Sequence, residues 1–189
     1  MYRGVSGVAR KVKKIYRGVS GVARQVKKGY RGVSGVARQF FGNEYLYNSG
    51  SNNISLHGGF YSYLRCGFGW NYYTDGSSNY GYCTITGGAS SFTVVGPSNT
   101  YGSIVTLNAL NLTNYSKLVI VVDSVSLYSS GGPRVGFATT NTEGFTGSYV
   151  QIGSTGTKTL DISSLTGNHY FAMAFQNKCS ITISKIYLE

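Results

Sequence analysis

The hydrophobic pattern from residue 45 to the C-terminus predicts a protein built from short β-strands. Runs rich in Val, Ile, Phe and Tyr alternate with breaks rich in Gly, Ser and Asn, and no segment sustains the period of an amphipathic helix. The expected strands are residues 54–57, 81–86, 91–95, 104–107, 117–123, 134–138, 149–152, 158–162, 169–175 and 180–187. So many short strands at regular spacing indicate an antiparallel β-sandwich.

Two segments indicate how these strands are covered. Residues 117–123, KLVIVVD, form a continuous apolar run that is typical of a strand covered on both faces. In the final segment, SITISKIYLE, Ile181 and Ile183 alternate with Ser and Thr, as expected for a last strand with one buried face. The two prolines, Pro97 and Pro133, both fall between expected strands.

The first 41 residues follow a different pattern, because one unit occurs three times. Tyr2, Tyr16 and Tyr30 each open a copy, so the period is fourteen residues. An even period preserves strand alternation from copy to copy, and the glycines in every copy would weaken a helix. Each copy contains Val-Ser-Gly-Val, in which β-branched residues flank a two-residue turn. We therefore expect this arm to form β-hairpins.

The Ser-Gly turn determines which residues of a copy lie opposite each other. In the first copy the expected pairs are Val5 with Val8, Gly4 with Ala9, Arg3 with Arg10 and Tyr2 with Lys11. Arginine opposite arginine is destabilising, and neither face has enough bulk to form a core. The other turn of a meander would fall at residues 13–14 and 27–28, where Lys-Lys is poor turn chemistry. The arm therefore needs another surface on which to dock.

The positive charge of the chain is concentrated in the arm. Eleven of the 17 Lys and Arg residues lie in residues 1–43, which contain no Asp or Glu. The six basic residues that follow equal the six acidic ones, so residues 44–189 are formally neutral. A change this sharp marks a domain boundary. We assign residues 1–43 to a basic triple-repeat hairpin arm and residues 44–189 to a β-sandwich.

A basic segment also has two other interpretations. It can be a solvated tail, although repetition of Tyr, Gly and Val is more than charge alone requires. It can also bind nucleic acid, with Lys and Arg on phosphates and Tyr stacked on bases. No recognition helix or known nucleic-acid fold accompanies these residues, so nucleic acid is not the expected partner.

The tandem units, Tyr-x-Gly-Val-x-Gly-Val-Ala-Arg-x-Val-Lys-Lys, resemble the N-terminal repeats of tail and other virion-associated proteins of bacteriophages that infect Gram-positive hosts. The resemblance covers residues 2–41 and implies an arm anchored to the virion, followed by a variable domain that faces outward. The docking residues it implies are Tyr2, Arg3, Val5, Val8, Arg10, Tyr16, Arg17, Val19, Val22, Arg24, Tyr30, Arg31, Val33, Val36 and Arg38.

Residues 44–189 resemble, in pattern, the jelly-roll carbohydrate-binding-like domains of phage structural proteins and glycan-active enzymes. The stretches that carry this likeness are ALNLTNYSKLVIVVDS and TKTLDISSLTGNHYFAMAFQNKCSITISKIYLE. It implies an all-β jelly-roll-like sandwich that binds a cell-surface polysaccharide.

The strongest candidate for a ligand site is CGFGWNYYTDGSSNYGYC, residues 66–83. Flat aromatic rings with a hydroxyl or indole N–H can stack on the C–H face of a sugar and hydrogen-bond to it. The glycan-binding candidates are Trp70, Tyr72, Tyr73, Tyr80 and Tyr82, and weaker ones in other loops are Tyr128, Phe145 and Tyr149. The alternative is that these rings fill the core of the sandwich or cover its open end.

Catalysis is not expected. Glycan hydrolysis needs two carboxylates on either side of the scissile bond, and Asp75 and Glu143 are better explained as turn residues. His57 and His169 are isolated, and an isolated His in a β-domain is more often a structural residue. No nucleophile elbow or zinc-protease motif occurs in the sequence. We expect no cofactor.

Metal sites and disulfides are also not expected. The three cysteines, Cys66, Cys83 and Cys179, have no Cys-x-x-Cys spacing, and no carboxylates cluster as a calcium site requires. Three thiols are an odd number, as expected of free cysteines in a reducing cytoplasm.

Together these observations favour a phage virion structural protein that attaches weakly and multivalently to host or environmental glycans. Its expected partners are other virion proteins through residues 1–43 and a polysaccharide through residues 44–189, with no membrane contact. We expect a homo-oligomer or many copies, assembled in the bacterial cytoplasm and released by lysis. The alternatives are a purely structural capsid, neck or tail decoration, and nucleic-acid binding through the arm.

Overall fold

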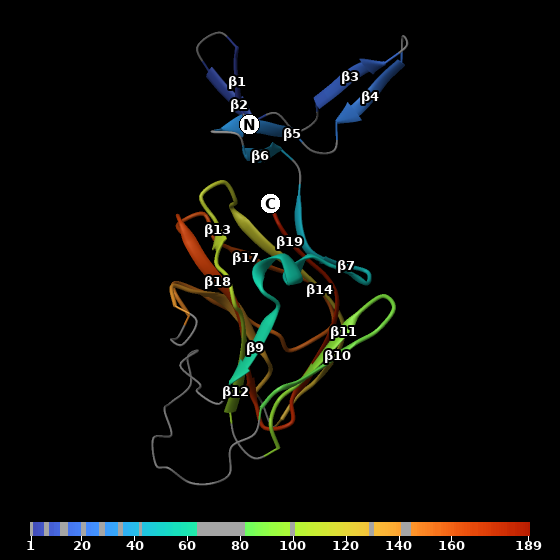
Figure 1. Cartoon of the computed structure of the whole chain (residues 1–189), viewed down its shortest axis with the longest axis vertical. Coiled ribbons are helices and arrows are strands. Elements are labelled where there is room, and N and C mark those ends of the chain that lie inside the picture. The colour runs from blue at the N-terminus through green and yellow to red at the C-terminus, as the bar shows by residue number, and fades with distance from the viewer. Residues whose placement is uncertain are drawn as a thin grey trace. The chain divides into compact units, whose positions relative to one another are not determined.

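The chain divides into two compact units, Met1–Glu44 and Tyr45–Glu189, each described by itself. The computed structural model (Figure 1) describes residues 2–5, 8–11, 15–19, 22–26, 29–33, 36–41, 43–63, 82–98, 101–128, 131–140 and 145–189, with the backbone alone for residues 2–41 and 63.

The first unit consists of three two-stranded antiparallel sheets, one for each copy of the repeat. The strands are β1 (Tyr2–Val5), β2 (Val8–Lys11), β3 (Ile15–Val19), β4 (Val22–Val26), β5 (Gly29–Val33) and β6 (Val36–Phe41). In the first hairpin Arg3 lies opposite Arg10, and Val5 lies opposite Val8. The hairpins and their register are therefore those that the Ser-Gly turn predicted.

The second unit contains two sheets. The larger one is called the β14 sheet. Its strands follow the order β10 (Thr84–Gly87), β11 (Phe92–Val95), β19 (Ser180–Leu188), β14 (Lys117–Ser126) and β17 (Gly156–Asp161). In the same sheet β7 (Glu44–Asn48) also pairs with β19, and β8 (Ser51–Asn52) pairs with β7. The other, called the β18 sheet, has the order β16 (Tyr149–Gln151), β15 (Arg134–Ala138), β18 (Asn168–Gln176), β12 (Tyr101–Thr106) and β9 (Phe60–Tyr63), with β13 (Leu110–Asn111) beside β18.

The connections between these strands define a jelly roll. From β11 to β19 the chain crosses repeatedly between the sheets, so that β11, β14, β17 and β19 belong to one sheet and β12, β15 and β18 belong to the other. Strands distant in sequence therefore become neighbours, as β11 and β19 do. This is the double-sheet arrangement of a jelly roll, and it confirms the expected all-β sandwich.

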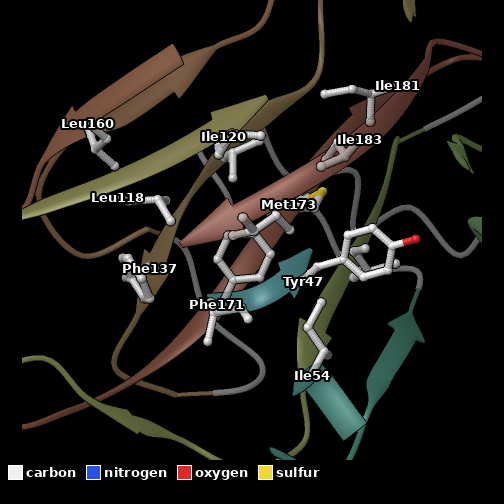
Figure 2. Close-up of a cluster of buried hydrophobic side chains, with 14 of the residues drawn as sticks. Tyr47, Ile54, Leu118, Ile120, Phe137, Leu160, Phe171, Met173, Ile181 and Ile183 are labelled. Atoms are coloured by element: carbon white, nitrogen blue, oxygen red, sulfur yellow. The ribbon is translucent and has the colours of Figure 1, made fainter. Parts of the chain in front are cut away.

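The hydrophobic core fills the space between the two sheets (Figure 2). Phe137 and Phe171 from the β18 sheet lie edge to face, with ring centroids 5.9 Å apart. The β14 sheet contributes Leu118, Ile120 and Ile183, which are fully buried. Because strand side chains alternate, residues between these core positions lie on the outer faces of the sheets.

One expected strand is a different element. Residues 54–57 belong to a 3-10 helix, η1 (Asn53–His57), so the prediction of a strand there was wrong. The side chain of Asn52 accepts a hydrogen bond from the backbone N–H of Ile54, which caps the first turn. Gly58, with φ of 81°, ends the helix in the left-handed conformation that favours glycine.

The turn between β18 and β19 buries a thiol. The Cys179 sulfur accepts a hydrogen bond from the backbone N–H of Gln176 at 3.2 Å, and the residue is fully buried. Burial raises the pKa of this thiol from 9.0 to about 11, because the thiolate would lose its hydration. Cys83 is also buried, and Cys66 lies outside the described residues.

The buried thiol predicts a pH-dependent contribution to stability. At pH 8 the thiol is mostly protonated in both states. As pH rises through 9 toward 11 the unfolded thiol ionises first, so the folded state loses stability. Relative to the wild type, Cys179→Ala should therefore lack a fall of about 2 kcal/mol in the free energy of unfolding between pH 8 and pH 10.5. Urea unfolding under reducing conditions at pH 8 and pH 10.5 measures the difference. An equal fall in both proteins would contradict the assignment.

Candidate functional site

The outer face of the β18 sheet carries a row of small residues between aromatic ones. Strand register places five residues side by side across the five main strands of the sheet. They are Tyr61 on β9, Val105 on β12, Ala172 on β18, Gly136 on β15 and Tyr149 on β16. Small residues therefore occupy the three central strands, and a tyrosine occupies each of the two edge strands.

The centre of this face is a hydrophobic cluster separate from the main core. Val105, Ala138, Ala172 and Ala174 are fully buried, although they lie on the outer side of the sheet. The partly buried rings that pack against them are Tyr101, Phe145 and Tyr170. We call these seven residues together with Tyr61, Arg134, Gly136 and Tyr149 the aromatic face.

A stack of three side chains forms one border of the aromatic face. The Phe145 and Tyr149 ring centroids lie 5.3 Å apart and their planes are tilted by 33°. The Arg134 guanidinium carbon lies 4.8 Å from the centroid of the Tyr149 ring, within the range of a cation–π interaction. A positive charge is thereby held beside an exposed tyrosine.

Gly136 makes room for this stack. A β-carbon placed on Gly136 would lie 2.9 Å from Cδ1 of Phe145 and 3.3 Å from the carbonyl oxygen of Ser148. The first distance is shorter than side chains tolerate, so any larger residue would move the Phe145 ring off the sheet. The absence of a side chain at this position therefore sets the position of the ring.

Two exposed tyrosines mark the lateral limits of the aromatic face. Tyr61 is 50% exposed and Tyr149 is 39% exposed. They lie on edge strands four inter-strand steps apart, which corresponds to ~19 Å at the usual spacing between strands. This distance suits an extended chain of several sugar rings better than a single ring.

The described carboxylates lie elsewhere. In the part of the chain that the structure describes, no Asp or Glu occupies an outward position of the β18 sheet. Asp123 accepts a hydrogen bond from the Ser184 hydroxyl at 2.7 Å, within the β14 sheet. Hydrogen bonds from Ser163, first from its side chain and then from its backbone, hold the pKa of Asp161 below its usual value. Asp75 and Glu143 lie outside the described residues.

The remaining titratable groups do not form a metal site in the described part of the chain, where no group of three His, Cys, Asp or Glu residues could hold an ion. His169 is buried, with Nδ1 3.4 Å from the carbonyl oxygen of Gly167. A buried histidine near the backbone suits a structural role.

The structure describes only part of the predicted site. Trp70, Tyr72, Tyr73 and Tyr80 lie outside the described residues, and their assignment stays a prediction. Tyr82 is described and is 61% exposed, just before β10. The side chains of the predicted docking residues also lie outside the description; their backbones form the three hairpins.

Among the weaker candidates, Phe145 and Tyr149 lie together in the aromatic face. Tyr128 lies elsewhere; it is exposed, and its backbone hydrogen-bonds to that of Gly131. Sequence reasoning missed Tyr61, Tyr101, Tyr170 and Arg134. One signal was available in FAMAF, where Ala172 and Ala174 alternate with core residues. Alanine at successive outward positions of a central strand leaves space for neighbouring rings.

No protein-family model matches the chain, and a comparison with curated proteins finds no match either. The described residues include no helix long and apolar enough to cross a membrane.

The contact of Gly136 with Phe145 generates a prediction about the aromatic face. Gly136→Ala should displace the Phe145 ring and lower the free energy of unfolding by about 1–3 kcal/mol, the usual cost of overpacking. Gly87→Ala is the matched control, because Gly87 is also in a strand and a β-carbon there meets nothing within 4 Å. Urea unfolding of both variants provides the comparison, and equal midpoints would contradict this account of the face.

Proposed function

We propose that the protein is a bacteriophage virion structural protein that binds a glycan through the aromatic face of its jelly roll and docks on the particle through its basic arm. The observation that carries the glycan-binding half is the row from Tyr61 to Tyr149, in which two exposed rings lie on either side of small residues that partly buried rings pack against.

The chemistry of the aromatic face fits a sugar chain. Stacking on Tyr61 and Tyr149 would use the apolar C–H faces of sugar rings, and the phenol hydroxyls would bond to sugar hydroxyls. Arg134 would add donors for a hydroxyl or a carboxylate group. No described outward residue of this sheet is a carboxylate, and the role proposed for the face is binding.

The uneven distribution of charge along the chain supports the docking half of the proposal. The arm carries eleven basic residues and no acidic ones, whereas the body is formally neutral. Two-stranded sheets are marginally stable alone, so three such hairpins suit a surface on which they can pack. The resemblance of the repeats to those of virion-associated proteins supports other virion proteins as that surface. Many copies on one particle would convert weak stacking into firm attachment.

A second candidate function is a purely structural decoration of the capsid, neck or tail. Val105, Ala172 and Ala174 are already fully buried, so the surrounding rings would serve only to seal the sheet. In this case the sandwich would stabilise the particle without binding a glycan.

Glycan binding is tested by removing the exposed rings. Tyr61→Ala and Tyr149→Ala should each weaken binding to host cell-wall or capsular polysaccharide by about tenfold, since each removes one stacking surface. Tyr187→Ala is the matched control, because Tyr187 lies on the outer side of the other sheet. Its ring packs against that of Tyr45, with ring centroids 5.1 Å apart. The measurement is a glycan array of the full chain, followed by calorimetry on any glycan bound. Equal affinities in all variants, or no glycan bound, would favour the structural decoration.

Docking through the arm is tested in the phage. A gene that lacks codons 2–43 should give particles without this protein, while the separate body still folds. Quantitative mass spectrometry of purified particles measures incorporation, and a host adsorption assay measures attachment. Undiminished incorporation would contradict the docking role. Normal adsorption with less heat-stable particles would support the structural alternative.

A further inference from the structure

The repeat length and the hairpin register together determine what happens if the three hairpins join. A period of fourteen residues divides into two five-residue strands, as in β3 and β4, and two two-residue turns. One turn is the Ser-Gly turn expected inside each hairpin, and the interval of two residues between the end of β4 and the start of β5 has the length that a second two-residue turn requires. The length of the repeat therefore allows the three hairpins to join into one continuous six-stranded meander.

Joining would align every arginine of the strands. Within the hairpins Arg3 lies opposite Arg10, Arg17 opposite Arg24 and Arg31 opposite Arg38. A two-residue turn at residues 13–14 would place Arg10 opposite Arg17, and one at residues 27–28 would place Arg24 opposite Arg31. Six arginines would then form one row across the sheet, ~4.8 Å from strand to strand.

A row of arginines would oppose joining of the hairpins. Among the described residues, no strand of one hairpin pairs with a strand of another. Like charges directly opposite each other destabilise a sheet, and joining adds two arginine pairs to the three already present. The free arm therefore has the register of a continuous sheet but carries a charge row that opposes its formation.

Residues on the same face as the arginines indicate what would relieve this repulsion. In the second hairpin Val19 pairs with Val22, Arg17 with Arg24 and Ile15 with Val26. Since these positions are two residues apart along each strand, all three pairs share one face, with aliphatic residues on both sides of the arginines. A suitable partner has carboxylates flanked by apolar surface, which an acidic protein surface provides and a phosphate backbone does not.

We propose that an acidic protein surface joins the three hairpins into one six-stranded sheet by neutralising the arginine row. This inference deepens the docking role proposed above, because it names the chemistry of the partner and a change of structure on docking. The open edges of the separate hairpins become paired in the process, so docking and sheet formation reinforce each other.

The test uses a charge-alternating variant of the full chain. Arg10→Glu, Arg24→Glu and Arg38→Glu together replace every second arginine of the row, so opposite charges would face each other throughout. Amide hydrogen exchange in residues 11–16 and 25–30, the segments that join hairpins, should slow by about tenfold or more without any partner. The matched control, Lys11→Glu with Gln25→Glu and Gln39→Glu, places glutamates on the opposite face of the same strands and should leave exchange fast.

The wild-type chain tests the partner. Poly-L-glutamate should protect the same two segments by about tenfold, and the charge-alternating variant should no longer bind it. Fast exchange in that variant would overturn sheet joining, and so would equal protection in the control. Protection of the wild type by duplex DNA but not by poly-L-glutamate would overturn an acidic protein as the partner. The exchange experiments use the isolated chain, whereas the docking role is tested by incorporation into phage particles. Failure of sheet joining can therefore be distinguished from failure of the docking role.

Discussion

The alternation of large and small residues along β18 is the constraint on which the rest of the body depends. Phe171, Met173 and Phe175 fill the space between the sheets, and burial of such side chains is the main favourable term in folding. Because strand residues alternate, the same burial places Ala172 and Ala174 on the outer face. A shift of one residue would exchange the two sets, which gives this strand a single register.

The central position of β18 extends that constraint to its neighbours. Its register against β12 and β15 places Val105 and Gly136 on either side of Ala172, and the Phe145 ring lies over the space that Gly136 leaves. The aromatic face is thus a consequence of core packing on the other side of the same strands. Most of its residues lie on the strands of one sheet, and Phe145, from the connection between β15 and β16, packs against them, which favours a preformed binding surface.

The fold was more predictable from the sequence than the site. Hairpin register in the arm follows from one local rule about two-residue turns, so it could be written down from Val5, Ser6, Gly7 and Val8 alone. The strand at 54–57 was wrongly predicted because Ile54 and Leu56 suggest alternation, whereas the Asn52 cap and Gly58 favour a helical turn. The aromatic face could not be predicted, because it brings together residues from 61 to 174 through pairings that a jelly roll sets at long range.

Two kinds of contact, kept in separate parts of the chain, explain the charge pattern. A ring that stacks on a sugar gains little energy alone, so the body must be presented in many copies to hold a surface. A body with the positive charge of the arm would also bind any polyanion on a cell surface, which would obscure the selectivity of the aromatic face. Residues 44–189 are formally neutral, and Arg134 is the one basic residue among those that make up the face. The arm is therefore free to be strongly basic toward one acidic partner, while the sandwich selects its ligand by the shape and stacking of its rings.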